Sequence, residues 1–238
     1  MRPLLSFIQI IYCLYAFVLF IVVMLILFPF IVLASMLGKV KGGNIIYKLC
    51  TIWAQTCMML WGIRHRNIYE TPDDPNRASI LVFNHGSYMD IPILMCAFKK
   101  HLIRVLGKIE MSNIPIFGFI YRNAVVTVDR TDASHRAKSV ATLKQVLAKN
   151  ISIVIAPEGT FNMSDQPLKS FYDGAFRIAI ETQTPIRPVL FLDAYDRLHY
   201  RSIFSLTPGK SRAVFLPEVK VDSYTSEDVA QLKQNVYN

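Results

Sequence analysis

A histidine and a carboxylate follow directly after an apolar stretch, Ser79–Phe83. The polar end of a buried strand is where α/β folds place functional side chains. His85 and Asp90 are five residues apart, so on one α-helix they would lie about 140° apart. They can meet if His85 lies in a turn permitted by Gly86 and Asp90 lies in the first helical turn beyond it. The carboxylate would then raise the basicity of the imidazole, which could deprotonate a hydroxyl. The alternative is a helix-capping aspartate beside a structural histidine.

A second polar cluster, Ala156–Thr160, also follows an apolar run. Glu158 stands between Pro157 and Gly159, which predicts a turn whose backbone can approach a ligand closely. Its carboxylate could bind hydroxyl groups. An ordinary surface turn is the alternative.

Two further segments combine apolar residues with arginine. Val126–Arg130 predicts a strand that ends in Arg130, whose planar guanidinium suits a phosphate; a solvated arginine is the alternative. In Pro185–Val189 the prolines predict a rigid wall or sheet edge, with simple packing as the alternative.

The overall composition restricts the class of protein. Of 238 residues, 53% are hydrophobic and 18% are charged. The charged share is below the quarter that is typical of soluble domains, and this composition excludes intrinsic disorder. The net charge of +9 favours an anionic partner such as a phospholipid surface, an acidic carrier protein or nucleic acid. The four cysteines show no C-x-x-C spacing, which predicts reduced thiols, no metal site and a cytosolic main domain.

The N-terminus is the most apolar part of the chain. Residues 3–38 contain no charged side chain, whereas about 20 apolar residues suffice to span a bilayer. Pro29 predicts a kink or an end, so one tilted span and a hairpin entering one leaflet both remain open. Asn44–Ile63, which contains Trp53 and Trp61, predicts an interfacial amphipathic helix or a second deep segment. More lysines follow the apolar run than precede it, which places the remainder in the cytoplasm.

The rest of the chain alternates between strand and helix patterns. This predicts an α/β fold with a mixed sheet flanked by helices, in which residues 1–66 anchor the chain in the membrane and residues 67–238 form the catalytic domain. A linker is expected at Thr71–Asn76. The expected strands are Ser79–Phe83, Ile103–Gly107, Ala124–Val128, Ile151–Ala156, Ile186–Leu192 and Arg212–Val219. The expected helices are Asp132–Lys149, Gly174–Thr182 and one from a Ser226 cap to Val236.

The order and spacing of the polar clusters resemble the four-block pattern of the glycerolipid acyltransferase family. The blocks are Asn84-His85-x4-Asp90, Val128-Asp129-Arg130, Pro157-Glu158-Gly159-Thr160 and Pro185-x-x-Pro188-Val189. Lys108-Ile109-Glu110, Ile114–Gly118 and Gly174–Phe176 also match stretches of that family. The resemblance is strongest to the lysophosphatidic acid acyltransferases and covers about residues 75–220.

The resemblance implies transfer of an acyl group from acyl-CoA or acyl-carrier protein to the sn-2 hydroxyl of lysophosphatidic acid, without a cofactor or metal. His85 would be the general base and Asp90 its orienting partner. The acceptor would be bound by Asn84, Lys108, Arg130 and the Glu158-Gly159-Thr160 turn. The expected partners are the bilayer, the lysophospholipid and the acyl donor, with no nucleic acid.

Two positions depart from the family pattern, and both lose a cation. Phe161 follows Glu-Gly-Thr where the family usually has arginine, and Tyr172 lies in a stretch that often carries lysine. Another lysolipid acceptor is therefore the nearest alternative function. A serine hydrolase using Ser87, or a lipid-binding protein without catalysis, would be different in class; the chain has no Gly-x-Ser-x-Gly elbow to support the former.

Overall fold

The computed structural model describes residues 2–129, 131–164 and 166–238. The chain forms two compact units. The first unit comprises Met1–Ile68, Gly86–Lys99 and Phe191–Val214, and the second comprises Tyr69–His85, Lys100–Leu190 and Phe215–Asn238. The division between residues 66 and 67 stays a prediction.

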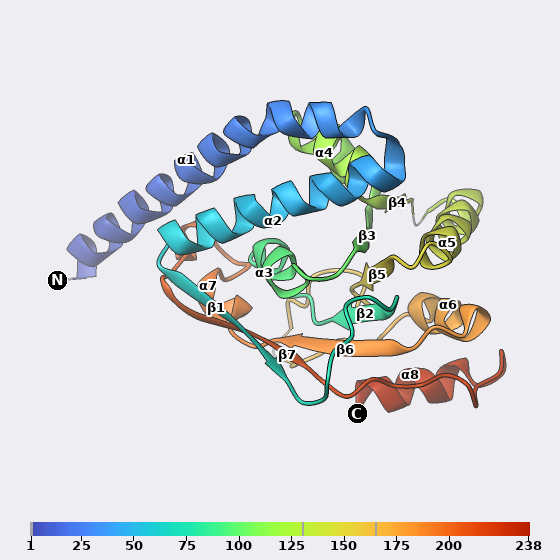
Figure 1. Ribbon diagram of the computed structural model, residues 1–238. Coiled ribbons are helices and arrows are strands. Elements are labelled where there is room, and N and C mark those ends of the chain that lie inside the picture. The colour runs from blue at the N-terminus through green and yellow to red at the C-terminus, as the bar shows by residue number, and fades with distance from the viewer. Residues whose placement is uncertain (1, 130, 165) are drawn as a thin grey trace. The chain divides into compact units, whose positions relative to one another are not determined.

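A pair of long helices dominates the first unit. The apolar run forms one helix, α1 (Arg2–Ser35), which continues through Pro29, and Figure 1 shows it bending towards its C-terminal end. A π-helical turn, η1 (Gly38–Gly42), leads into α2 (Gly43–Leu60), which runs back beside α1 (Figure 1). Gly42 is required in this turn because a Cβ there would lie 2.3 Å from the Ala34 carbonyl oxygen.

The predicted helical periodicity of the second stretch is confirmed in α2. Its buried positions recur every three or four residues, so one face of the helix packs inside the unit: Gly43, Ile46, Tyr47, Ala54, Cys57 and Met58. Trp61 is buried rather than interfacial, and its Nε1 donates to the Ala16 carbonyl oxygen at 3.1 Å. Trp53 similarly donates to the Phe20 carbonyl oxygen at 3.3 Å. The two indole groups therefore connect α2 to α1 through hydrogen bonds.

Shorter elements complete the first unit. Helix α3 (Asp90–Ala97) packs against α2. Strands β1 (Ile63–Tyr69) and β7 (Gly209–Phe215) are neighbours, and all but the last residue of each belongs to this unit. The remaining elements are α7 (Ala194–Arg197) and η3 (Ile203–Ser205).

The second unit is built on parallel strands in the order β6-β2-β5-β3-β4. The pairs β2–β6, β2–β5, β3–β5 and β3–β4 are all parallel. Val219 forms an antiparallel bridge with Ile186, which makes the strand pairing mixed, as predicted. The strands are β2 (Ile80–Phe83), β3 (Ile103–Lys108), β4 (Val126–Val128), β5 (Ser152–Ile155) and β6 (Ile186–Phe191).

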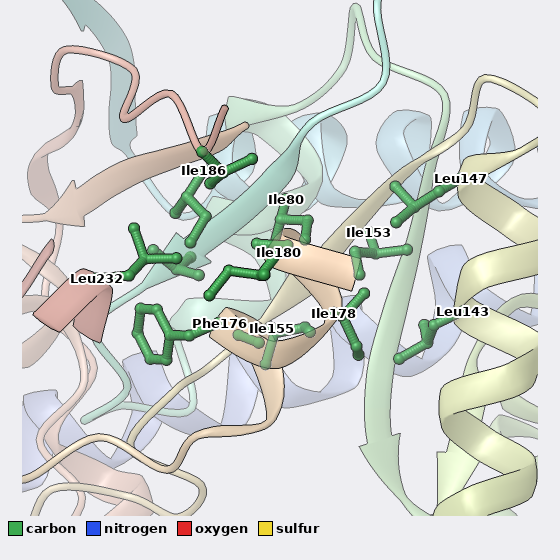
Figure 2. Packing of buried hydrophobic residues seen from close by; sticks show 14 of the residues in the cluster. Ile80, Leu143, Leu147, Ile153, Ile155, Phe176, Ile178, Ile180, Ile186 and Leu232 are labelled. Atoms are coloured by element: carbon green, nitrogen blue, oxygen red, sulfur yellow. The ribbon is translucent and has the colours of Figure 1, made fainter. Parts of the chain in front are cut away.

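Three helices bury one face of these strands. Ile80 of β2 and Ile153 of β5 contribute to a core with α5 (Ala133–Leu147), α6 (Gly174–Thr182) and α8 (Val229–Tyr237), as Figure 2 shows. The helices η2 (Ile109–Asn113) and α4 (Phe117–Ala124) complete the unit. Burial of this apolar core holds the strand ends in place, and the polar clusters follow those ends.

Most of the expected elements are confirmed, and α6 has the predicted bounds. The expected strand Arg212–Val219 is displaced: β7 ends at Phe215, because Pro217 lacks the amide that continued pairing would need. The Ser226 cap is wrong, because α8 begins after Asp228, whose carboxylate accepts hydrogen bonds from Thr225. Strand β1 was not predicted, because its alternating arginines and histidine give it no apolar run.

Candidate active site

The parallel strands of the second unit carry most of the predicted site residues at one edge. Parallel strands have their carboxyl ends on the same side of the sheet, where α/β folds bind ligands. Asn84 and His85 follow β2, the Glu158 turn follows β5, and Lys108 is the last residue of β3. Arg130, two residues after β4, lies outside the described residues.

The backbone of His85 is fixed on both sides. Its amide donates to Glu158 Oε1 at 2.9 Å, and its carbonyl oxygen accepts from the Asn162 amide at 2.6 Å. The imidazole is half-buried and lies edge-to-face against two aromatic rings, with centroids 4.4 Å from Phe161 and 5.8 Å from Phe83. Phe161, the departure from the family pattern, therefore lies directly against the histidine.

Glu158 is buried, with 1% of its surface exposed. Its second oxygen, Oε2, accepts from the Lys169 amide at 2.9 Å. Burial raises the pKa of Glu158, and the hydrogen bonds from the His85 and Lys169 amides partly oppose that rise. The carboxylate thus connects the β2 turn to the segment before α6, while its predicted contact with substrate hydroxyls stays a prediction.

The turn that carries Glu158 depends on a glycine. Gly159 has φ of 75°, and its amide donates to the Ala156 carbonyl oxygen at 3.0 Å. A residue with a Cβ would be strained in this conformation. Thr160, the next residue, accepts a hydrogen bond from Lys169 Nζ at 2.7 Å on its hydroxyl oxygen. Sequence analysis missed Lys169, because it lies in a loop with no local pattern.

The Asp90 turn belongs to the first unit. Asp90 is the first residue of α3, as predicted, and is 2% exposed. Its Oδ2 accepts from the amides of Gly86 and Ser87, both at 3.0 Å. The amides of Gly86 and Ser87 therefore hold this carboxylate at the start of α3. The contact between the two side chains stays a prediction.

Ser87 is used by the fold of the same turn. It is fully buried, and its hydroxyl donates to the Leu198 carbonyl oxygen at 2.5 Å. The hydroxyl oxygen of Ser87 in turn accepts a hydrogen bond from the Met89 amide at 3.0 Å. These two hydrogen bonds give the Ser87 hydroxyl a structural role and do not point it toward a substrate as a nucleophile.

Comparison with known proteins identifies the family to which the chain belongs. A family model described as Acyltransferase matches residues 63–192, more than half of the chain. A 1-acyl-sn-glycerol-3-phosphate acyltransferase from Cocos nucifera is 26% identical over 176 residues, which are 72% of this chain and 56% of that protein. The alpha form from Ovis aries is 26% identical over 210 residues, 86% of this chain and 71% of that protein.

Other matches differ in coverage. An uncharacterized acyltransferase from Schizosaccharomyces pombe is 30% identical over 160 residues, 66% of this chain and 57% of that protein. The chain therefore spans a little over half the length of the coconut and fission yeast relatives. The crystal structure of a 1-acyl-sn-glycerophosphate acyltransferase from Thermotoga maritima matches with a TM-score of 0.70 at 22% identity, covering 100% of this chain and 97% of that one. This likeness establishes a shared fold.

Proposed function

Because the chain belongs to the acyltransferase family, as its motifs predicted, we propose that it transfers a fatty acyl group from acyl-CoA or acyl-carrier protein to the sn-2 hydroxyl of lysophosphatidic acid. The product is phosphatidic acid. Support comes from the coconut and sheep relatives, which are named as 1-acyl-sn-glycerol-3-phosphate acyltransferases. Another lysolipid acceptor is the nearest alternative. No cofactor is proposed, since the thioester donor is itself a substrate.

The observation that carries the proposal is the fixed placement of His85 at the carboxyl edge of the parallel strands. In the proposed step the imidazole takes the proton of the acceptor hydroxyl as its oxygen attacks the thioester carbonyl. The new C–O bond forms, the C–S bond breaks, and the imidazolium returns the proton to the departing thiolate. A positioned base of this kind contributes typically about 10²–10⁴-fold to the rate.

Asp90 is proposed as the orienting partner of His85. Its Oδ2 is held by the Gly86 and Ser87 amides, which fixes the carboxylate at the start of α3. The positive end of that helix favours the ionised carboxylate. An ionised carboxylate can hold the imidazole in one tautomer and stabilise the imidazolium that forms during transfer.

The acceptor site is proposed along the same strand edge. Asn84, Glu158, Gly159 and Thr160 would contact the glycerol part of the acceptor, and Lys108 and Arg130 its phosphate. Lys108 is exposed at the end of β3, where a cation can reach an anionic ligand.

Membrane association is proposed through α1. Within the described residues, one helix is long and apolar enough to cross a membrane, Phe7–Ser35, by length and composition. Many of its large apolar side chains are exposed, including Phe7, Phe17, Ile26 and Leu33. Exposed apolar surface of this extent suits a lipid environment. The lysines that follow α1 favour placing the catalytic residues on the cytoplasmic face.

A purified-enzyme assay with a panel of donors and lysolipid acceptors tests the proposal, with His85→Ala and Asp90→Asn as variants. We expect the wild type to acylate lysophosphatidic acid and His85→Ala to lose activity by about three orders of magnitude. Acylation of a different lysolipid alone would overturn the acceptor assignment. Equal transfer by the wild type and His85→Ala would instead indicate a lipid-binding protein without this catalysis.

A further inference from the structure

The segment between β5 and α6 folds back on the turn after β5. The Lys169 amide donates to Glu158 Oε2, and the Tyr172 amide donates to the Pro157 carbonyl oxygen at 2.9 Å. At the start of the same segment, the Asn162 amide donates to the carbonyl oxygen of His85. These bonds place Lys169 beside the turn that carries Glu158 and Thr160.

The charges in this cluster are unevenly satisfied. The carboxylate of Glu158 is occupied by two backbone amides, from His85 and Lys169. The ammonium of Lys169 instead bonds to a neutral hydroxyl, Thr160 Oγ1, at 2.7 Å. Among the described residues it forms no ion pair, although its charge favours the ionised form of Glu158. An ammonium has three donors, so the contact with Thr160 leaves two for an anionic ligand.

The position and the charge of Lys169 together indicate an anionic ligand. Lys169 is half-buried, and its ammonium contacts a hydroxyl on the turn after β5. Phe161, on the same turn, supplies an apolar ring to the imidazole of His85 and no charge. Lys169 is therefore the residue that places a positive charge beside this turn.

We propose that Lys169 binds the phosphate group of the lysolipid acceptor. The inference rests on the proposed acyl transfer, because it assigns a residue to the acceptor of that reaction. It places the acceptor's headgroup against the segment between β5 and α6, and it makes Lys169 a determinant of preference for phosphate-bearing lysolipids.

The test measures binding without turnover. The probe is a lysophosphatidic acid analogue that lacks the sn-2 hydroxyl, compared with its dephosphorylated form, and affinity is measured by calorimetry in detergent with no acyl donor present. Lys169→Met should weaken binding of the phosphate-bearing analogue about 10- to 100-fold, the loss expected for one charge-assisted contact. Binding of the dephosphorylated analogue should be unchanged, and Lys169→Arg should restore most of the loss.

Lys144→Met is the matched control, since Lys144 forms a surface ion pair with Glu181 and should leave both affinities unchanged. Equal weakening of both analogues by Lys169→Met, or no weakening of either, would overturn the proposal. A raised KM for acyl-CoA with unchanged analogue affinity would also overturn it, by assigning Lys169 to a donor phosphate. Because binding is read without chemistry, a wild type that binds the analogue but transfers no acyl group would refute the proposed function separately.

Discussion

The backbone amide of His85 donates a hydrogen bond to Glu158 Oε1 at 2.9 Å, which joins the turns after two neighbouring parallel strands. The same carboxylate holds the Lys169 amide through its other oxygen. A buried acidic side chain thus organises the backbone on which the proposed base and the proposed phosphate-binding cation stand.

Replacing Glu158 should reduce catalysis more than binding. Glu158→Ala leaves the amides of His85 and Lys169 without their acceptor, so the His85 turn should shift and kcat should fall about 100-fold, with a much smaller change in KM. Glu158→Gln keeps an acceptor oxygen for His85 and should lose less. Steady-state kinetics with lysophosphatidic acid measures both, and Glu181→Gln on the exposed side of α6 is the control. A rise in KM without loss of kcat would instead indicate that Glu158 acts chiefly through its proposed contact with the acceptor and not through the His85 turn.

The pH dependence of stability should carry a signature of Glu158. Burial raises its pKa in the folded protein, so the folded state retains a proton that the unfolded state has released. Stability from this group is therefore complete below the ordinary value of 4.5 and falls as pH rises from there through the raised pKa. As pH rises over this window, the melting temperature of the wild type should fall relative to that of Glu158→Gln. A wild type that becomes more stable relative to Glu158→Gln as pH rises would contradict a raised pKa for Glu158.

The sequence predicted those parts of the site that follow local rules. Apolar patterning predicted the strands before His85 and Glu158. A turn permitted by Gly86 and the early helical position of Pro92 predicted that Asp90 lies in the first turn of α3. The role of Lys169 could not be predicted, because its contact with Thr160 spans nine residues and depends on how the intervening loop returns to the turn. Side-chain bonds between distant segments leave no periodic trace in a sequence.

The same reasoning explains the elements that were missed or displaced. Strand β1 alternates the exposed Arg64 and Arg66 with the half-buried His65 and Asn67, so its pairing with β7 rather than its own hydrophobicity makes it a strand. His65, within it, bonds to Ser211 at 3.0 Å. By contrast, α6 ends where predicted because Gln183 adopts a left-handed conformation shortly before Pro185.

Ser87→Ala should retain acyl transfer. The hydroxyl of Ser87 is buried between the Leu198 carbonyl oxygen and the Met89 amide, so its removal should cost about 1–2 kcal/mol of stability. Activity of the folded fraction should stay within a few-fold of the wild type. The measurement is transfer activity together with labelling by a fluorophosphonate probe. Labelling at Ser87, with activity abolished in the variant, would favour the serine hydrolase alternative.

A pair of variants tests the ion pair between Asp193 and Arg212 in the first unit. Two hydrogen bonds join them, at 2.8 and 2.9 Å, and the Asp193 side chain is 4% exposed whereas that of Arg212 is 36% exposed. Arg212→Leu leaves a buried carboxylate without its partner and should lower the melting temperature by several degrees. Asp193→Asn leaves only a half-exposed guanidinium and should lower it less.

The hydrogen bonds from Arg212 lower the pKa of Asp193, so the stability they provide is present above the ordinary value of 3.8 and is lost as pH falls through the lowered pKa. The gap between the wild type and Arg212→Leu should therefore narrow on acidification. Adding Asp193→Asn to Arg212→Leu removes the orphaned charge and should recover part of the loss, as a double-mutant cycle of melting temperatures would show. Equal effects of the two single variants at neutral pH would contradict this account, because the two partners differ so clearly in burial.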